Sequence, residues 1–153
     1  METELAKESA IEDGDRVYSL FNMKIEEASP QHSRVSMPIT DITCNGMGFV
    51  HGGVLFSLAD IAFGAASNFG EKTGTVTLST SMQFLAPGRH GPLVAEANCI
   101  RAGRHIVVYS VDIHDANDLL LAHGTFEGFR TDFAFTNLKQ SEKTDKTADE
   151  KQD

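Results

Sequence analysis

The sequence predicts an α+β fold in which one long central helix is wrapped by a curved antiparallel sheet of about five to six strands. Three observations predict it: one segment, Gly52 to Asn68, is apolar almost all the way round, strand-like patterns flank it, and short turns separate the later strands. A helix without a polar face is a buried helix, so the strands must enclose it. The apolar stripe at helical spacing is Val54, Leu55, Leu58, Ile61, Ala62 and Ala65, and Phe56, Ala59, Phe63 and Ala66 cover much of the remaining surface.

The clearest strand pattern follows this helix. From Thr75 to Leu85, apolar and polar side chains alternate with a period of two, which is typical of a half-buried strand. We expect one face to carry Val76, Leu78, Met82 and Phe84, and the other Thr75, Thr77, Ser79, Ser81 and Gln83.

Two strands are expected before the helix and four after it. The turns at Ala102-Gly103 and Ala116-Asn117 favour hairpins, so the last four strands are predicted to form an antiparallel meander. The expected ranges are Ser19–Glu26, Arg34–Ile39, Thr75–Leu85, Leu93–Arg101, His105–His114 and Leu119–Arg130.

The chain of 153 residues divides into three parts. Residues 1–15 are acidic and are expected to be a short helix or a flexible lead-in. Residues 16–135 have the composition of one folded domain. Residues 136–153 are so rich in charged and polar side chains that we expect a disordered tail, because little apolar surface is available to offset the ordering entropy.

Charge and composition limit the function classes. With 22 acidic and 13 basic side chains the formal net charge is −9, which argues against a general nucleic-acid or anionic-membrane binder. Two cysteines, Cys44 and Cys99, are too few for a disulfide scaffold and lack metal-ligand spacing. Without an apparent signal peptide or a long apolar run, we expect a cytoplasmic protein with no membrane insertion and no metal site.

Asp60 is the first candidate for a functional residue. It lies in the middle of the expected buried helix, and no Lys or Arg occurs from Asp41 to Phe69. Perturbed carboxylates concentrate at functional sites, because an unpaired buried charge is costly. Two other interpretations stay open: Asp60 lies in an exposed indentation of the surface, or it pairs with a distant arginine.

His51-Gly52-Gly53 precedes the helix. The first amides of a helix are unsatisfied donors at its positive end, which suits an oxyanion, although the same pattern also makes a plain helix cap. His51 is a general base, a tautomer-fixed group or a turn residue. Asn45 either orients a substrate carbonyl or water, or makes a turn. Thr77 either partners Asp60 or lies on a solvated face.

Basic residues gather at two turns of this acidic chain. Arg89 and His90 follow one strand, and Arg101 and Arg104 flank the next turn. Such groups either hold phosphates through charge-assisted hydrogen bonds or are solvated surface charges.

Taken together, these features resemble the hotdog-fold acyl-CoA thioesterases of the PaaI group. The resemblance rests on the helix that opens with His51-Gly52-Gly53, on Asp60 nine residues after His51, on Asn45 six residues before it, and on the strand end Phe84–Gly88. It covers roughly residues 20–130 and implies hydrolysis of an acyl-CoA to a free acid and CoA, with CoA as part of the substrate and no cofactor.

The resemblance also implies roles. Asp60 would be the general base or the nucleophile, and the Gly52 N–H would polarise the thioester carbonyl. Asn45 would position the thioester or the water, His51 would assist orientation, and Thr77 would hold the water or Asp60.

The expected contacts with CoA carry one departure from the family. Relatives commonly have a basic residue before the proline of the strand end, where this chain has Ala86, so the nearest cation is Arg89. The residues expected to bind the substrate's CoA part are Gly53, Arg89, His90, Arg101, Gly103 and Arg104. The acyl group is expected to meet Phe49, Phe56, Phe63 and Met82.

The resemblance further implies a homodimer with shared active sites. The Asp60 helix of one subunit would face the Asn45–Gly53 loop of the other, and two dimers would pair into a tetramer. The alternatives are a hotdog-fold dehydratase or hydratase, and a non-catalytic module that binds acyl-CoA.

Overall fold

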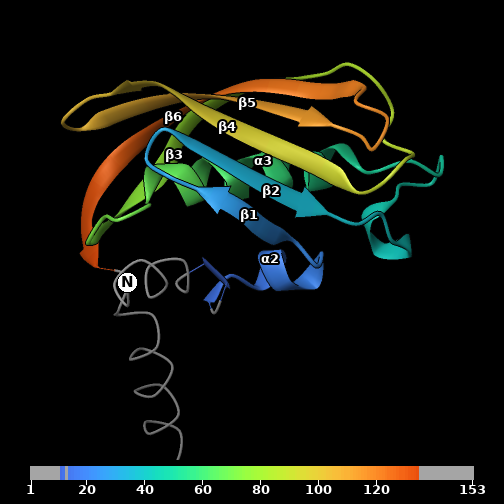
Figure 1. Ribbon diagram of the computed structural model, residues 1–153, viewed down its shortest axis with the longest axis horizontal. Coiled ribbons are helices and arrows are strands. Elements are labelled where there is room, and N and C mark those ends of the chain that lie inside the picture. The colour runs from blue at the N-terminus through green and yellow to red at the C-terminus, as the bar shows by residue number, and fades with distance from the viewer. Residues whose placement is uncertain (1–10, 13, 135–153) are drawn as a thin grey trace, which may run out of the picture.

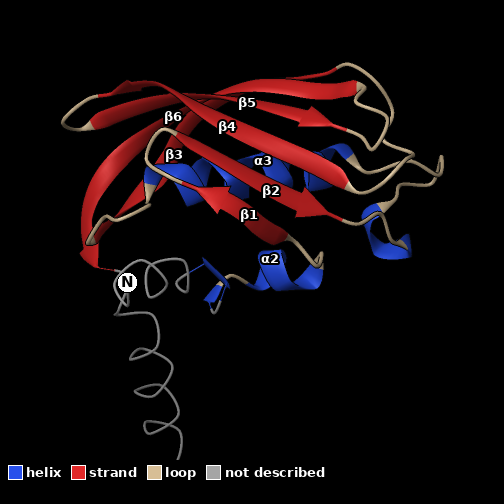
Figure 2. Ribbon diagram, viewed as in Figure 1, coloured by secondary structure: helices blue, strands red, loops and turns tan. Residues whose placement is uncertain are grey.

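The computed structural model describes residues 11–12 and 14–134, and it confirms the α+β fold: a six-stranded antiparallel sheet curves around one long helix (Figures 1 and 2). Most of the expected lead-in and the whole of the expected tail, 136–153, lie outside the described residues. None of the helices in the described part of the chain has the length and hydrophobicity to cross a lipid bilayer. The elements are α2 (Arg16–Leu20), β1 (Lys24–Ala28), β2 (His32–Met37), the 3₁₀ helix η1 (Asp41–Thr43), α3 (Gly52–Ser67), β3 (Thr73–Phe84), β4 (Leu93–Ala102), β5 (Ile106–His114) and β6 (Leu120–Ala134).

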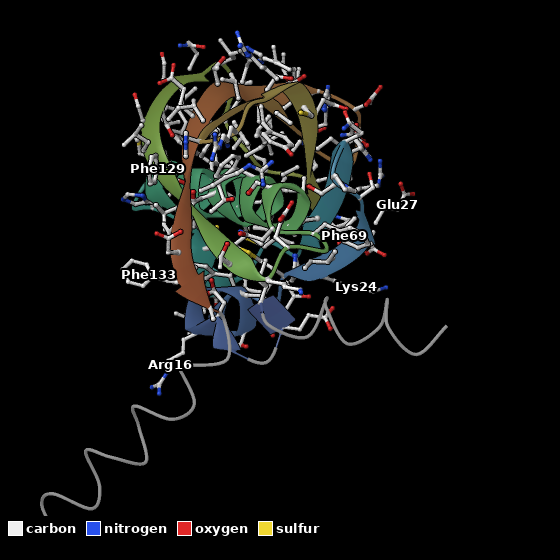
Figure 3. All side chains as sticks on the ribbon, turned by 90° about the vertical axis from the view of Figure 1, so that its left-hand side faces the viewer. Arg16, Lys24, Glu27, Phe69, Phe129 and Phe133 are labelled. Carbon is white, nitrogen blue, oxygen red and sulfur yellow. The ribbon has the colours of Figure 1, made fainter. Side chains whose placement is uncertain are left out.

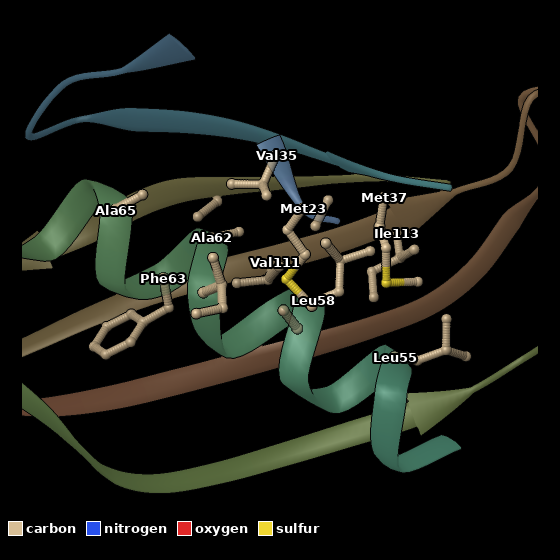
Figure 4. Packing of buried hydrophobic residues seen from close by; sticks show 14 of the residues in the cluster. Met23, Val35, Met37, Leu55, Leu58, Ala62, Phe63, Ala65, Val111 and Ile113 are labelled. Atoms are coloured by element: carbon tan, nitrogen blue, oxygen red, sulfur yellow. The ribbon is translucent and has the colours of Figure 1, made fainter. Parts of the chain in front are cut away.

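Helix α3 confirms the predicted central helix, and the sheet wraps around it (Figure 3). Its buried side packs against side chains of β2, β4 and β5 (Figure 4). Leu58 and Ala62 are fully buried, and the buried Ser33 hydroxyl donates to the Ala62 carbonyl at 2.5 Å, which ties the helix to β2. Tyr109 donates to the Pro30 carbonyl at 2.6 Å, and burial raises the pKa of its phenol above the ordinary value. The helix is therefore fixed on its sheet side by apolar burial and by one buried hydrogen bond.

The sheet order, β1-β2-β4-β5-β6-β3, corrects the predicted four-strand meander. Only β4, β5 and β6 form one, and β3 pairs with β6 at the far edge. The connection 85–92 is long enough to run from β3 at the edge of the sheet to β4. The two strands are three strand spacings apart, about 14 Å, whereas eight extended residues span up to about 26 Å. The chain can therefore place β4 next to β5 although β3, the preceding strand, pairs with β6.

The first predicted strand, Ser19–Glu26, is wrong in its first half. Residues Arg16–Leu20 form helix α2, and the strand begins only at Lys24. Asp15 starts the helix, since its side chain accepts a hydrogen bond from the Tyr18 N–H at 3.0 Å.

The alternation predicted for 75–85 is interrupted in β3. The strand carries an irregularity between Thr77 and Ser79, and an extra residue of this kind moves the following side chains to the other face. Before this irregularity Thr77 faces the helix and Val76, on the opposite face, is 50 % exposed. Leu78, at the irregularity, is 60 % exposed. The edge strand of the sheet therefore presents apolar side chains that this chain does not cover.

Candidate active site

Asp60 and Thr77 meet between α3 and β3. The Thr77 hydroxyl donates to Asp60 Oδ1 at 2.5 Å, although 17 residues separate the two in sequence. Asp60 is half-buried, and none of the ion pairs within the described residues involves it. The helix thus holds an oriented carboxylate whose second oxygen is available to another group.

The first turn of α3 leaves one backbone donor without an acceptor. His51 is the N-cap: its carbonyl accepts from the N–H groups of Val54 and Leu55, and its Nδ1 accepts from the Gly53 N–H at 3.0 Å. Within residues 14–134, no acceptor is found for the Gly52 N–H. The free donor lies at the positive end of a 16-residue helix.

The same contact defines the state of His51. A neutral imidazole that accepts at Nδ1 carries its proton on Nε2, so the exposed edge of the ring presents a donor and not a base. The structure therefore supports a tautomer-fixed His51. It also engages the Gly53 N–H internally, so the amide of Gly53 is not free for a substrate contact.

Asn45 lies in the loop before the helix and makes a local turn. Its Oδ1 accepts from the Met47 N–H at 2.9 Å and from the Phe49 N–H at 3.4 Å, and its own N–H donates to the Phe49 carbonyl at 2.8 Å. No hydrogen bond joins Asn45 to Asp60 in the described part of the single chain.

Gly52 and Asp60 lie too far apart to serve one carbonyl group within a chain. Eight residues of helix separate them, a rise of about 12 Å. An oxyanion donor must lie about 3 Å from the carbonyl oxygen, and a base must reach the attacking water at a similar distance. Within one chain, Gly52 and Asp60 therefore cannot act on the same carbonyl group.

The predicted phosphate contacts fall into two separate groups. Arg89 and His90 are exposed on the connection 85–92, while Arg101 and Arg104 are exposed at the β4–β5 turn. Strand β4, which begins after the first group and contains Arg101 near its end, is ten residues or about 30 Å long, so the two groups lie at opposite ends of it. At the second turn, the Gly103 N–H donates to the Ile106 carbonyl at 2.9 Å and a Cβ atom there would lie 2.6 Å from that oxygen, so this glycine is required by the turn itself.

The four residues expected to meet the acyl group also separate. Phe63 is buried in the core, stacked on Phe126 at 5.5 Å, whereas Phe56 is 37 % exposed and packs on the same ring at 5.7 Å. Met82 is half-buried, and Phe49 lies under the guanidinium of Arg89. Phe56 and Met82 thus remain candidates for an acyl contact.

Phe84 is a residue that the sequence did not assign to the site. Its ring is close enough to Gly52 that a Cβ atom on the glycine would lie 3.6 Å from Phe84 Cε1. In the sequence, the strand end Phe84–Gly88 served only as a feature of the family resemblance. The fold shows that this strand ends beside the N-terminus of α3.

Comparison with protein families and curated sequences gives consistent results. The family described as the thioesterase superfamily matches residues 47–122. A putative esterase of Archaeoglobus fulgidus is 32 % identical over 126 residues, covering 80 % of this chain and 81 % of the relative. A putative esterase of Deinococcus radiodurans is 38 % identical over 95 residues, which cover 61 % of this chain and 64 % of that protein. The acyl-coenzyme A thioesterase PaaI of Escherichia coli is 39 % identical over 80 residues, 52 % of this chain and 56 % of PaaI.

Solved structures agree with the fold. The structure of E. coli PaaI, from the phenylacetic acid degradation operon, matches with a TM-score of 0.79 and 27 % identity, covering 87 % of this chain and 96 % of PaaI. A Streptococcus mutans protein bound to acetyl-CoA matches with a TM-score of 0.66 and 29 % identity, covering 72 % of this chain and 89 % of that protein.

Proposed function

The chain belongs to the thioesterase superfamily of hotdog-fold thioester hydrolases, and we propose that it hydrolyses an acyl-CoA to a free carboxylic acid and CoA. One observation carries the proposal: the buried helix that holds the oriented Asp60 carboxylate also begins with a free Gly52 N–H. A thioester is already activated toward acyl transfer, so one carboxylate and one oxyanion donor are sufficient. The acyl-CoA thioesterase activity of PaaI and the acetyl-CoA bound by the S. mutans protein support the substrate class.

In the proposed reaction, the Gly52 N–H and the positive end of α3 stabilise the negative charge that develops on the carbonyl oxygen. Asp60 either removes a proton from the attacking water or attacks the carbonyl carbon itself. Thr77, by donating to one oxygen of the carboxylate, directs the other oxygen toward the substrate. When the tetrahedral intermediate collapses, the C–S bond breaks and the CoA thiolate leaves; if Asp60 is the base, it passes the proton taken from the water to this sulfur. If Asp60 is the nucleophile, collapse leaves an anhydride between Asp60 and the acyl group, and a water molecule then hydrolyses it to the free acid and regenerates the carboxylate. The proposed reaction needs no cofactor.

The rise of about 12 Å between Gly52 and Asp60 is the reason to propose a homodimer with shared sites. If Asp60 of one copy works with the partner subunit's Gly52, two-fold symmetry places the two helices antiparallel and creates two identical sites. Asn45 then reaches the site from the partner's loop. The exposed Val76 and Leu78 on the edge strand β3 supply apolar surface for a second copy. Dimers of this kind pairing into tetramers would extend the same arrangement.

A panel of short, medium, long and aryl acyl-CoAs, followed by release of free thiol, tests the proposal. We expect hydrolysis of at least one class, and a loss of about 100-fold or more in Asp60→Asn, because base assistance contributes about 10²–10⁴ in rate. The asparagine keeps an oxygen that accepts from Thr77, so the thermal transition should stay near that of the wild type.

Glu127→Gln is the matched control, since it likewise replaces a carboxylate by an amide, but at an exposed residue of β6 away from the Asp60–Thr77 pair. It should keep full activity. The proposal fails if the wild type releases no thiol from any member of the panel, or if Asp60→Asn keeps more than about a tenth of the activity.

A further inference from the structure

Phe49 and Arg89 form a contact that the proposed reaction does not use. The Arg89 guanidinium lies over the Phe49 ring, with its central carbon 5.5 Å from the ring centroid. Within the described residues none of the ion pairs involves Arg89, so no carboxylate neutralises its charge. The side chain is exposed and held, which leaves its donors free to meet an anion.

The backbone places the two residues side by side. The Val50 N–H donates to the Gly88 carbonyl at 3.0 Å, and Phe49 and Arg89 are the next residues on either side of this hydrogen bond. Gly88 is buried, and a Cβ atom there would lie 3.3 Å from Val50 Cβ, so the close approach of the two loops depends on this glycine. The contact between ring and guanidinium therefore rests on a fixed loop pair.

The pair also lies close to the free donor of the helix. Phe49 precedes Gly52 by three residues, and the intervening segment is held by the His51 N–H, which donates to the Thr43 carbonyl at 2.9 Å. A CoA thioester whose carbonyl binds the Gly52 N–H must lead its phosphate groups away along a pantetheine arm. Because Arg89 is held against the loop that leads into Gly52, the two residues of one chain would serve the same site in a shared dimer.

We infer that Phe49 is a positioning residue for CoA binding: its ring holds the Arg89 guanidinium in place for the phosphate groups of CoA. This inference rests on the proposed function. It moves Phe49 from the acyl group, where the sequence placed it, to the opposite end of the substrate. Because an exposed cation–π contact is weak, the expected effect on affinity is about two- to fivefold.

Calorimetric titration of the full-length chain with CoA and with pantetheine tests the inference, because pantetheine lacks the phosphates. Phe49→Leu should weaken CoA binding about two- to fivefold and leave pantetheine binding unchanged. Phe49→Tyr keeps the aromatic face and should bind CoA like the wild type. Phe133→Leu, at a phenylalanine that is 78 % exposed near the end of β6, is the matched control and should change neither.

A double-mutant cycle sharpens the test. Arg89→Ala should weaken CoA binding more than Phe49→Leu does, and in the Arg89→Ala background Phe49→Leu should have no further effect. In turnover, Phe49→Leu should raise KM for the acyl-CoA and leave kcat unchanged.

The inference is overturned if Phe49→Leu binds CoA like the wild type, if it weakens CoA and pantetheine equally, or if its effect persists without Arg89. These outcomes differ from failure of the proposed function, which would show as absence of thiol release by the wild type across the whole panel.

Discussion

Helix α3 has two sides that are buried to different extents within one chain: the sheet side, which packs against β2, β4 and β5, and the open side, which faces the edge strand β3. On the side that faces the sheet, Leu58 and Ala62 are fully buried, and Ser33 adds a hydrogen bond to the helix backbone. On the side that faces the edge strand β3, Asp60 is half-buried and Phe56 is partly exposed. The same helix therefore has one side that supports the fold and another that remains open to a ligand or a second copy.

The residues of this helix that stabilise the fold therefore differ from those of the candidate active site. Apolar burial and a satisfied hydrogen bond stabilise the sheet side. The open side carries a carboxylate that belongs to none of the ion pairs within the described residues and an amide without a protein acceptor there, the two groups that the proposed reaction uses. Substitutions on the two sides should accordingly change different measured quantities.

Of the two sides, the open side is expected to give the larger effect, as in Gly52→Pro. Proline lacks the N–H, and it is accepted at the first helical position. The preceding residue, His51, already has φ −62° and ψ 137°, the extended conformation that a following proline requires. We expect kcat to fall about 100- to 1,000-fold, the usual cost of one oxyanion donor, with no loss of thermal stability.

Gly52→Ala is the control for this variant. It keeps the N–H, and its Cβ atom would make an ordinary 3.6 Å contact with Phe84. Steady-state thiol release should therefore stay near the wild-type rate. Equal loss of activity in the proline and alanine variants would mean that the side chain, and not the missing amide, causes the effect.

On the sheet side, Ser33→Ala is expected to have a smaller effect, on stability and not on activity. The substitution removes the hydroxyl that donates to the Ala62 carbonyl, which retains its place in the helix. We expect the free energy of unfolding, measured in urea, to fall by about 1 kcal/mol. The kcat for the best acyl-CoA should not change, and a tenfold drop would show that the two sides are coupled.

The sequence predicted the central helix closely because its evidence is local: apolar residues at helical spacing over 52–68. The capping residue, His51, became clear only in the structure. The path of β3 could not be predicted in the same way. Nothing local distinguishes pairing with β6 from pairing with β4, and the irregularity after Thr77 depends on neighbours across the sheet. The helix at Arg16–Leu20 was missed although its signal, Asp15, was present.

The candidate site shows the same limit. The sequence singled out Asp60 from its place in the apolar helix and named Thr77 as a candidate partner, and the structure joins them by a hydrogen bond. Periodicity alone left open whether Thr77 partners Asp60 or only lies on a solvated face. The contacts of His51 with Gly53 and of Phe49 with Arg89 depend on how loops fold back, so residue types and spacing did not reveal them.

The central claim, that each active site combines Asp60 of one subunit with the partner subunit's Gly52, can be tested by complementation. Asp60→Asn and Gly52→Pro chains carrying different affinity tags are co-expressed, and the mixed dimer is isolated. One of its two sites then has an intact Asp60 and an intact Gly52, so thiol release should recover to about half the wild-type rate per dimer. A mixed dimer no more active than its two parents would contradict the shared site.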